Sequence, residues 1–107
     1  MGLDVEIYFW NPAFQSKDDA RVYEYSGRYM MPINRIVCKS LKTENIPNPL
    51  RCKLKRRTLK EIERYLKRLI ENGGSGNSFT DEALLTEIKL LIHCLENGWE
   101  VEYNGSW

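Results

Sequence analysis

The chain has 107 residues and a mass of 12.6 kDa, so we expect residues 1–107 to form a single domain. Its 42% hydrophobic and 29% charged residues are ordinary values for a globular protein and exclude a chain that is disordered throughout. The formal net charge of +1 excludes a protein that is basic over its whole surface, and no apolar run has the length of a transmembrane helix. Asp4 stands where a secretory signal peptide carries Lys or Arg, so we expect a cytoplasmic protein without membrane contact.

The first half of the chain has the patterns of strands. Residues 3–10 alternate between apolar and mostly polar side chains, which predicts a strand whose apolar face is buried. Residues 17–20 fit a loop or a short helical turn, residues 21–25 a second strand, and residues 33–41 a further extended segment. Two prolines exclude a helix interior at 45–49, and the weakest signals lie in 13–32 and 42–57.

Two helices follow. Thr58 and Glu61 have the spacing of a capping box, apolar residues then repeat at helical spacing, and Gly73 ends the first helix. The second helix begins at Ser78 and ends before Gly98. The short glycine-rich connection predicts an antiparallel pair, and it lacks the Gly-Lys-Ser/Thr of a phosphate-binding loop.

Residues 99–103 alternate again and predict a last strand that is buried on its aromatic face. The order of strands, two helices and one strand predicts an α+β fold. In that fold a small, mostly antiparallel sheet is packed on one face by an antiparallel two-helix hairpin. We expect Trp107 to dock back onto the fold, and the alternative is an aromatic anchor for a partner.

The sequence offers little for catalysis. Three cysteines and one histidine are too few and too scattered for a typical zinc site or disulfide framework, so we expect no metal and no cofactor. Cys38 and Cys94 lie among apolar neighbours and fit small buried side chains. Cys52 lies between Arg51 and Lys53, which would favour a reactive thiolate. Without a recognisable nucleophile–base pair, we expect the protein not to be an enzyme.

Charge is unevenly distributed along the chain. Residues 51–68 hold nine basic and two acidic residues, whereas residues 69–107 hold one basic and seven acidic residues. Basic residues at the start of a helix oppose its macrodipole, so stability does not explain Arg56 and Arg57. The candidate partner-binding residues flank the apolar stripe of the first helix and are Arg56, Arg57, Lys60, Arg64, Lys67 and Arg68.

This basic set has a structural and a functional explanation. Structurally, it is a solvated helix face that Glu61, Glu63 and the acidic second helix partly neutralise. Functionally, it is a surface that binds an anionic partner, either an acidic protein surface or nucleic acid. The acidic half offers a converse surface, which could bind a basic partner and consists of Glu87, Glu96, Glu100 and Glu102.

The two chain ends carry a resemblance. Met1-Gly2-Leu3-Asp4 before a strand resembles the MGLD-Met-Tyr-Leu opening of a family of small, uncharacterised phage and prophage proteins. The ending Tyr103-Asn104-Gly105-Ser106-Trp107 resembles the family's Tyr-x-Ser-Ser-Trp terminus, and the family also has a helix before its last strand. Val5-Glu6 stands where the family has Met-Tyr, Gly105 replaces Ser, and the middle of the chain does not match.

The resemblance implies a phage or mobile-element source in a bacterial cytoplasm, and a first strand that meets the last with Trp107 against them. It carries no activity and no functional residues. Small proteins of that source often bind and disable a host complex. We therefore expect a non-enzymatic binding protein that inhibits a host defence or nucleoprotein complex, such as a CRISPR effector, through the basic helix face. The alternative is a module that binds nucleic acid directly through the same helix. The sequence leaves the partner, the oligomeric state and the strand order open.

Overall fold

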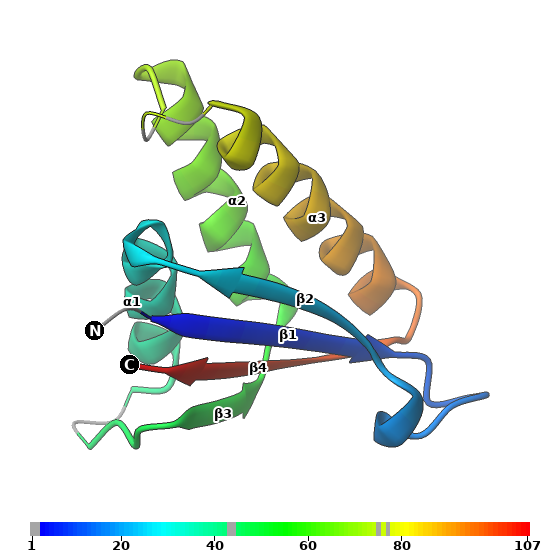
Figure 1. The fold of residues 1–107 in the computed structure, drawn as a ribbon. Coiled ribbons are helices and arrows are strands. Elements are labelled where there is room, and N and C mark those ends of the chain that lie inside the picture. Colours follow the sequence, from blue (N-terminus) through cyan, green and yellow to red (C-terminus); the bar gives the residue numbers. More distant parts are fainter. Residues whose placement is uncertain (1–2, 43–44, 75, 77) are drawn as a thin grey trace.

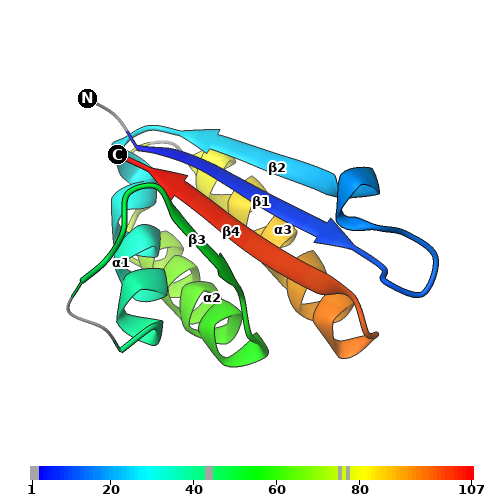
Figure 2. The ribbon, with the colours of Figure 1, turned by 90° about the horizontal axis from the view of Figure 1, so that it is seen from below.

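The computed structural model describes residues 3–42, 45–74, 76 and 78–107. Met1 and Gly2 of the opening motif, and Ser75 and Asn77 of the glycine-rich connection, lie outside these residues. The fold is α+β, with one antiparallel sheet and a layer of helices on one of its faces, as Figures 1 and 2 show.

The sheet has four strands in the order β2-β1-β4-β3. The strands are β1 (Asp4–Trp10), β2 (Arg21–Ser26), β3 (Leu50–Lys53) and β4 (Glu100–Ser106). The central pair is β1 and β4, so the first and last strands do lie side by side. The helices are α1 (Met31–Ser40), α2 (Arg56–Glu71) and α3 (Ser78–Glu96), with short 3-10 turns η1 (Lys17–Asp19) and η2 (Arg28–Met30).

The alternation of β1 and β4 fixes the two faces of the sheet. Ile7 lies opposite Tyr103 and Phe9 opposite Val101, and all four are buried beneath the helices. The alternate residues, such as Glu6 and Asn104, point to the other face, which none of the described α-helices covers (Figure 2). We call this second face the open face; the β1–β2 connection with η1 folds over one end of it (Figure 1).

The helix hairpin is confirmed. The helices α2 and α3 pack against each other and are joined by a short connection at the end furthest from the sheet (Figure 1). Gly73 and Gly98 follow the two helix ends at φ of 98° and 84°, the left-handed conformation that glycine adopts readily. Leu59, Ile62 and Leu66 of α2 are buried, as the predicted apolar stripe requires.

Three local predictions are corrected. Residues 31–40 form helix α1 rather than an extended segment, because Met30, Ile33 and Val37 are buried at helical spacing and Pro32 is tolerated in the first turn. The capping box at Thr58 is wrong: α2 begins two residues earlier and Thr58 faces the interior. Trp107 docks onto the fold only in part: its main chain exchanges hydrogen bonds with Asn48, and the residue stays 38% exposed.

Candidate binding surface

Helix α2 places its basic residues opposite its buried stripe. Arg56, Arg57, Arg64, Lys67 and Arg68 are exposed and Lys60 is half-buried, so all six predicted residues lie on the outer side of one helix. The helix belongs to the layer that covers one face of the sheet (Figure 1), and its buried residues are Thr58, Leu59, Ile62, Glu63 and Leu66.

Ion pairs hold three of the six basic side chains. Arg56 Nε lies 3.3 Å from Glu96 Oε2, which connects the start of α2 to the end of α3. Lys60 Nζ and Lys67 Nζ lie 3.5 and 4.0 Å from the same oxygen, Glu63 Oε1. Because Glu63 is only 9% exposed, it neutralises the two lysines from below rather than presenting charge to solvent. The structural explanation of the basic set therefore accounts for these three residues.

The other three basic residues are arginines without such partners. Within the described part of the chain, Arg57, Arg64 and Arg68 take part in no ion pair. Arg64 follows Arg57 by seven residues and Arg68 follows Arg64 by four, so the three side chains share one narrow face of α2. At a rise of 1.5 Å per residue, this face is about 16 Å long. We call these three residues the arginine row.

The predicted acidic surface is largely neutralised. Glu96 pairs with Arg56, Glu100 Oε1 lies 3.2 Å from Lys53 Nζ, and Glu102 pairs with Lys17. Glu87 accepts a hydrogen bond from the Tyr25 hydroxyl. Because each of the four glutamates already has a partner, the arginine row is the less compensated of the two predicted surfaces.

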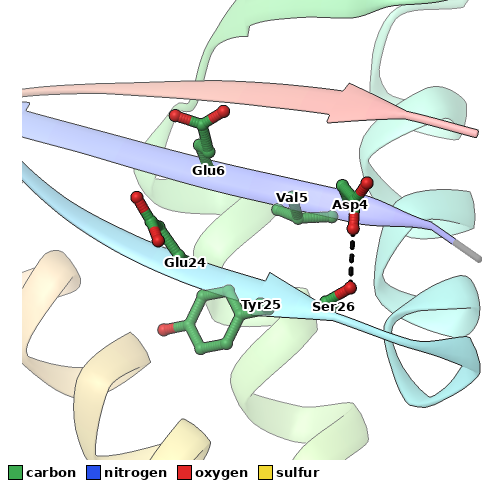
Figure 3. A pocket seen from close by; sticks show the side chains of 6 residues that line it. All are labelled: Asp4, Val5, Glu6, Glu24, Tyr25 and Ser26. Carbon is green, nitrogen blue, oxygen red and sulfur yellow. Dashed lines mark hydrogen bonds between the residues drawn. The ribbon is translucent and has the colours of Figure 1, made fainter.

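A different acidic site is created by strand pairing. On the open face, Glu6 of β1 lies directly opposite Glu24 of β2, and like charges in that position are destabilising. Asp4 lies one pair further along and accepts a hydrogen bond of 2.6 Å from Ser26 Oγ (Figure 3). The hollow there has a volume of about 480 Å³ and is lined by Asp4, Val5, Glu6, Glu24, Tyr25 and Ser26.

A second hollow on the same face has mixed charge. It has a volume of about 440 Å³, and the Lys17–Glu102 ion pair crosses it from η1 to β4. Its lining residues are Tyr8, Lys17, Asp18, Arg51, Glu102 and Asn104. Neither hollow was predicted, because each depends on which strands pair and in which register. The sequence signal that could have indicated the acidic hollow is the alternation of Asp4 and Glu6, which places both carboxylates on one face of β1.

Burial shifts the thiol pKa of all three cysteines in one direction. Burial raises the pKa of the Cys52 thiol, and the neighbouring Cys38 and Glu102 raise it further. Arg51 and Lys53 do not favour a thiolate here, because those two residues point to the open face whereas Cys52 points under the helices. Burial also raises the pKa of Cys38 and Cys94. Cys94 is buried as predicted, and Cys38 is half-buried.

The fold and the site thus define an α+β protein with a basic row on one helix and a partly acidic sheet face that the described α-helices leave uncovered. Among the described His, Cys, Asp and Glu residues, no group of three is placed to hold a metal ion. Of the helices in the described ranges, none combines the length and hydropathy that crossing a bilayer requires. Comparison with protein-family models, with curated proteins and with solved structures finds no match.

Proposed function

We propose that this chain is a non-enzymatic binding protein whose arginine row engages an acidic surface on a partner protein or nucleoprotein complex. The observation that carries the proposal is the set of three exposed arginines, aligned on α2 and in no ion pair in the described structure. A guanidinium donates in a rigid, planar fork, so a row of three matches carboxylates or phosphates spaced along a surface.

The electrostatics at the start of α2 support a role of Arg57 in binding, because Arg57, unlike Arg56, is in no ion pair in the described structure. Lys55 is the N-cap residue, Arg56 and Arg57 follow it, and the first turn contains no acidic residue. These positive charges lie at the positive end of the helix dipole and disfavour the folded helix slightly. An acidic partner placed against the row would compensate that charge.

The proposal extends to the source of the protein through the resemblance of its ends. A phage or prophage protein in a bacterial cytoplasm would meet host complexes as partners, and occlusion of a host defence or nucleoprotein complex, such as a CRISPR effector, is the mode of action that we propose.

Glu96 and Glu63 keep three of the basic residues in place, so the predicted six-residue set divides into a row that contacts the partner and side chains that support it.

Direct binding of nucleic acid is the competing function. Phosphates would satisfy the same arginines, although no exposed aromatic residue lies among them on α2, where the half-buried Tyr65 is the one aromatic residue. This composition gives no support for stacking of single-stranded bases. Duplex binding through phosphates alone would weaken steeply as salt is raised.

The test is capture of a partner from a bacterial lysate by the tagged protein, with and without nuclease, using three versions of the chain. The first is the unaltered chain, and the second carries Arg57→Glu, Arg64→Glu and Arg68→Glu. The third carries Arg28→Glu, Arg35→Glu and Lys39→Glu, which change the net charge equally at exposed positions around α1. We expect a defined protein partner that survives nuclease, is retained by the α1 control and is lost by the row variant.

Three results would contradict the proposal. Equal capture by the row variant and the α1 control would show that the arginine row is not the contact. Loss of every partner on nuclease treatment, together with binding of generic duplex DNA that falls steeply with salt, would show direct nucleic-acid binding instead. Absence of any captured protein with the unaltered chain would leave no partner for the row to engage.

A further inference from the structure

The sheet has one long unpaired edge. Strand β2 lies at the end of the order β2-β1-β4-β3 and pairs only with β1 among the described strands. It has six residues, of which none is proline or glycine, and includes Val22, Tyr23 and Tyr25, types that favour strands. The opposite edge strand, β3, has four residues and carries Arg51 and Lys53, and short, charged edges resist pairing with another chain. The two edges therefore differ in their capacity to extend the sheet.

The backbone groups that β2 presents to solvent follow from its pairing with β1. Gly27 N donates to Leu3 O at 2.9 Å, which makes that pair a hydrogen-bonded one. Hydrogen-bonded pairs alternate along an antiparallel ladder, so Arg21, Tyr23 and Tyr25 direct their N–H and C=O groups to β1. Val22, Glu24 and Ser26 then direct theirs away from the sheet, where they can pair with a further strand.

Exposed apolar side chains border this edge on both layers. Val22, on the open face of β2, is 40% exposed, and Leu90 of α3 is 44% exposed. Glu87 accepts the hydrogen bond of Tyr25, and Leu90 follows one turn later on the same flank of α3, so it lies on the side of the helix layer that borders β2. Two of the four large apolar side chains that are exposed in the described structure therefore flank the free edge.

Self-pairing of this edge has a preferred register. If β2 pairs antiparallel with a second copy about a two-fold axis at Tyr23, Val22 lies opposite Glu24 of the other copy, and Arg21 lies opposite Tyr25. Both arrangements are favourable or neutral, and Arg21 can stack on the tyrosine ring. A shift by one residue would place side chains of opposite sheet faces together, and a shift that puts the axis at Glu24 would oppose the two Glu24 carboxylates. A shift that puts the axis at Val22 would pair only three residues of each β2, Arg21 to Tyr23, whereas the axis at Tyr23 pairs five.

We propose that two copies of this chain associate through their β2 edges, antiparallel about a two-fold axis at Tyr23, so that their four-stranded sheets form one continuous sheet. The outward N–H and C=O groups of Val22 and Glu24 pair across the axis, and Leu90 faces the helix layer of the second copy. The inference does not depend on the proposed function. It would place two arginine rows on the same side of the joined sheet, which is an arrangement suited to bivalent binding.

The first test is the mass of the purified chain in sedimentation equilibrium at several concentrations, with Val22→Pro and Val22→Thr as a matched pair. We expect a species of twice the 12.6 kDa chain mass for the unaltered chain and for Val22→Thr. Val22→Pro should be monomeric, because proline removes an outward N–H that the monomer does not use. Circular dichroism will show whether Val22→Pro folds, and if it does not, Leu90→Glu serves as the second disrupting variant. Its control is Phe14→Glu, because Phe14 lies in the β1–β2 connection and is 84% exposed.

The second test addresses the register. In the proposed pairing, Val22→Lys places a lysine opposite Glu24 at two symmetric positions, whereas Val22→Glu places a glutamate there. We expect the dimer dissociation constant to fall for Val22→Lys and to rise for Val22→Glu, each by roughly 2- to 30-fold.

Three outcomes overturn the proposal. They are a monomer at every concentration, a dimer that persists in a folded Val22→Pro or Leu90→Glu variant, and equal dissociation constants for Val22→Lys and Val22→Glu. A chain that stays monomeric and binds an extended peptide of another protein at β2 would also overturn the proposal, because the occupant of the edge would then not be a second copy.

Discussion

At the scale of single residues, a buried hydrogen bond joins the sheet to α1. The Tyr103 hydroxyl donates to Asn34 Oδ1 across 2.6 Å, and both residues are almost fully buried. Gly105 leaves no spare room beside them, because a Cβ atom there would lie 2.9 Å from Tyr103 Cε1 and 3.0 Å from Asn34 Oδ1. The three residues are thus fitted to one another, and the polar pair is satisfied only while both partners are present.

Removal of both partners should therefore cost less than the sum of the two single removals. We expect Tyr103→Phe and Asn34→Leu each to lower the free energy of unfolding by about 1–3 kcal/mol, since each leaves a buried polar atom without a partner. The double variant should lose less than the sum of the two, which urea unfolding of all four chains in a double-mutant cycle would measure. Tyr29→Phe is the control, because the Tyr29 hydroxyl has no hydrogen-bond partner within the described residues. Additive losses would contradict the coupling.

At the scale of elements, α2 combines the proposed binding surface with an unfavourable first turn. Arg57 lies at the positive end of the helix and Arg68 in its last turn, where a cation is favourable, and neither is in an ion pair in the described structure. The same substitution should therefore have opposite effects at the two positions. The different effects on stability would distinguish Arg57, whose charge disfavours the helix, from Arg68, whose charge stabilises it.

We expect Arg57→Glu to raise the free energy of unfolding by about 0.5–1 kcal/mol and Arg68→Glu to lower it by a similar amount at low ionic strength. Urea unfolding of the two variants would measure both effects, and added salt should reduce both. If Arg57→Glu also abolished partner capture, a stabilising change would have removed the function. A decrease in stability for Arg57→Glu would show that this arginine has a structural role.

Elements with a single clear periodicity could be predicted from the sequence. The alternation of residues 3–10 and the stripe of α2 identified β1 and α2 and their buried faces, because each pattern reports which side meets the core. Helix α1 was missed because Ile36 and Val37 favour strands, while the burial of Ile33 and Val37 on one side depends on the sheet above them. Strand β3 was missed because four residues are too few for a period.

The candidate site was predictable in composition but not in detail. The basic residues of α2 follow from the charge count and helical spacing. Their division into held and unpaired residues depends on Glu96, forty residues from Arg56 along the chain, and on the burial of Glu63. Likewise, the acidic hollow exists only because the β1–β2 register sets Glu6 opposite Glu24. The register between strands that are far apart in the sequence cannot be predicted from local sequence patterns.

At the scale of the whole molecule, its buried aromatic residues set a limit on stability at high pH. The pKa is raised above the ordinary tyrosine value of 10.0 for five of the six tyrosines, which are Tyr8, Tyr23, Tyr25, Tyr65 and Tyr103. Burial is the main cause for Tyr103 and Tyr25, and the hydrogen bond to Glu87 raises the pKa of Tyr25 further. The folded state therefore keeps protons that the unfolded chain releases near pH 10.

This difference fixes the direction of the pH dependence. A group whose pKa is higher in the folded state gives its full stabilisation below the unfolded pKa, and that contribution is lost as pH rises above it. We expect the free energy of unfolding to fall above pH 10.0 by up to about 1.4 kcal/mol per pH unit for each tyrosine that ionises only on unfolding. Urea unfolding on both sides of that pH, with tyrosinate absorbance recorded in parallel, would measure it.

The absorbance distinguishes this mechanism from general alkaline damage. If Tyr25 and Tyr103 are protected by burial, their tyrosinate signal should rise together with the loss of secondary structure rather than before it. Tyr103→Phe removes one of the protected protons, so a folded Tyr103→Phe chain should lose stability less steeply with pH than the unaltered chain, although it starts from a lower value. Equal slopes for the two chains would mean that the Tyr103 hydroxyl ionises in the folded state, and that the sheet is accessible to hydroxide beneath its helices.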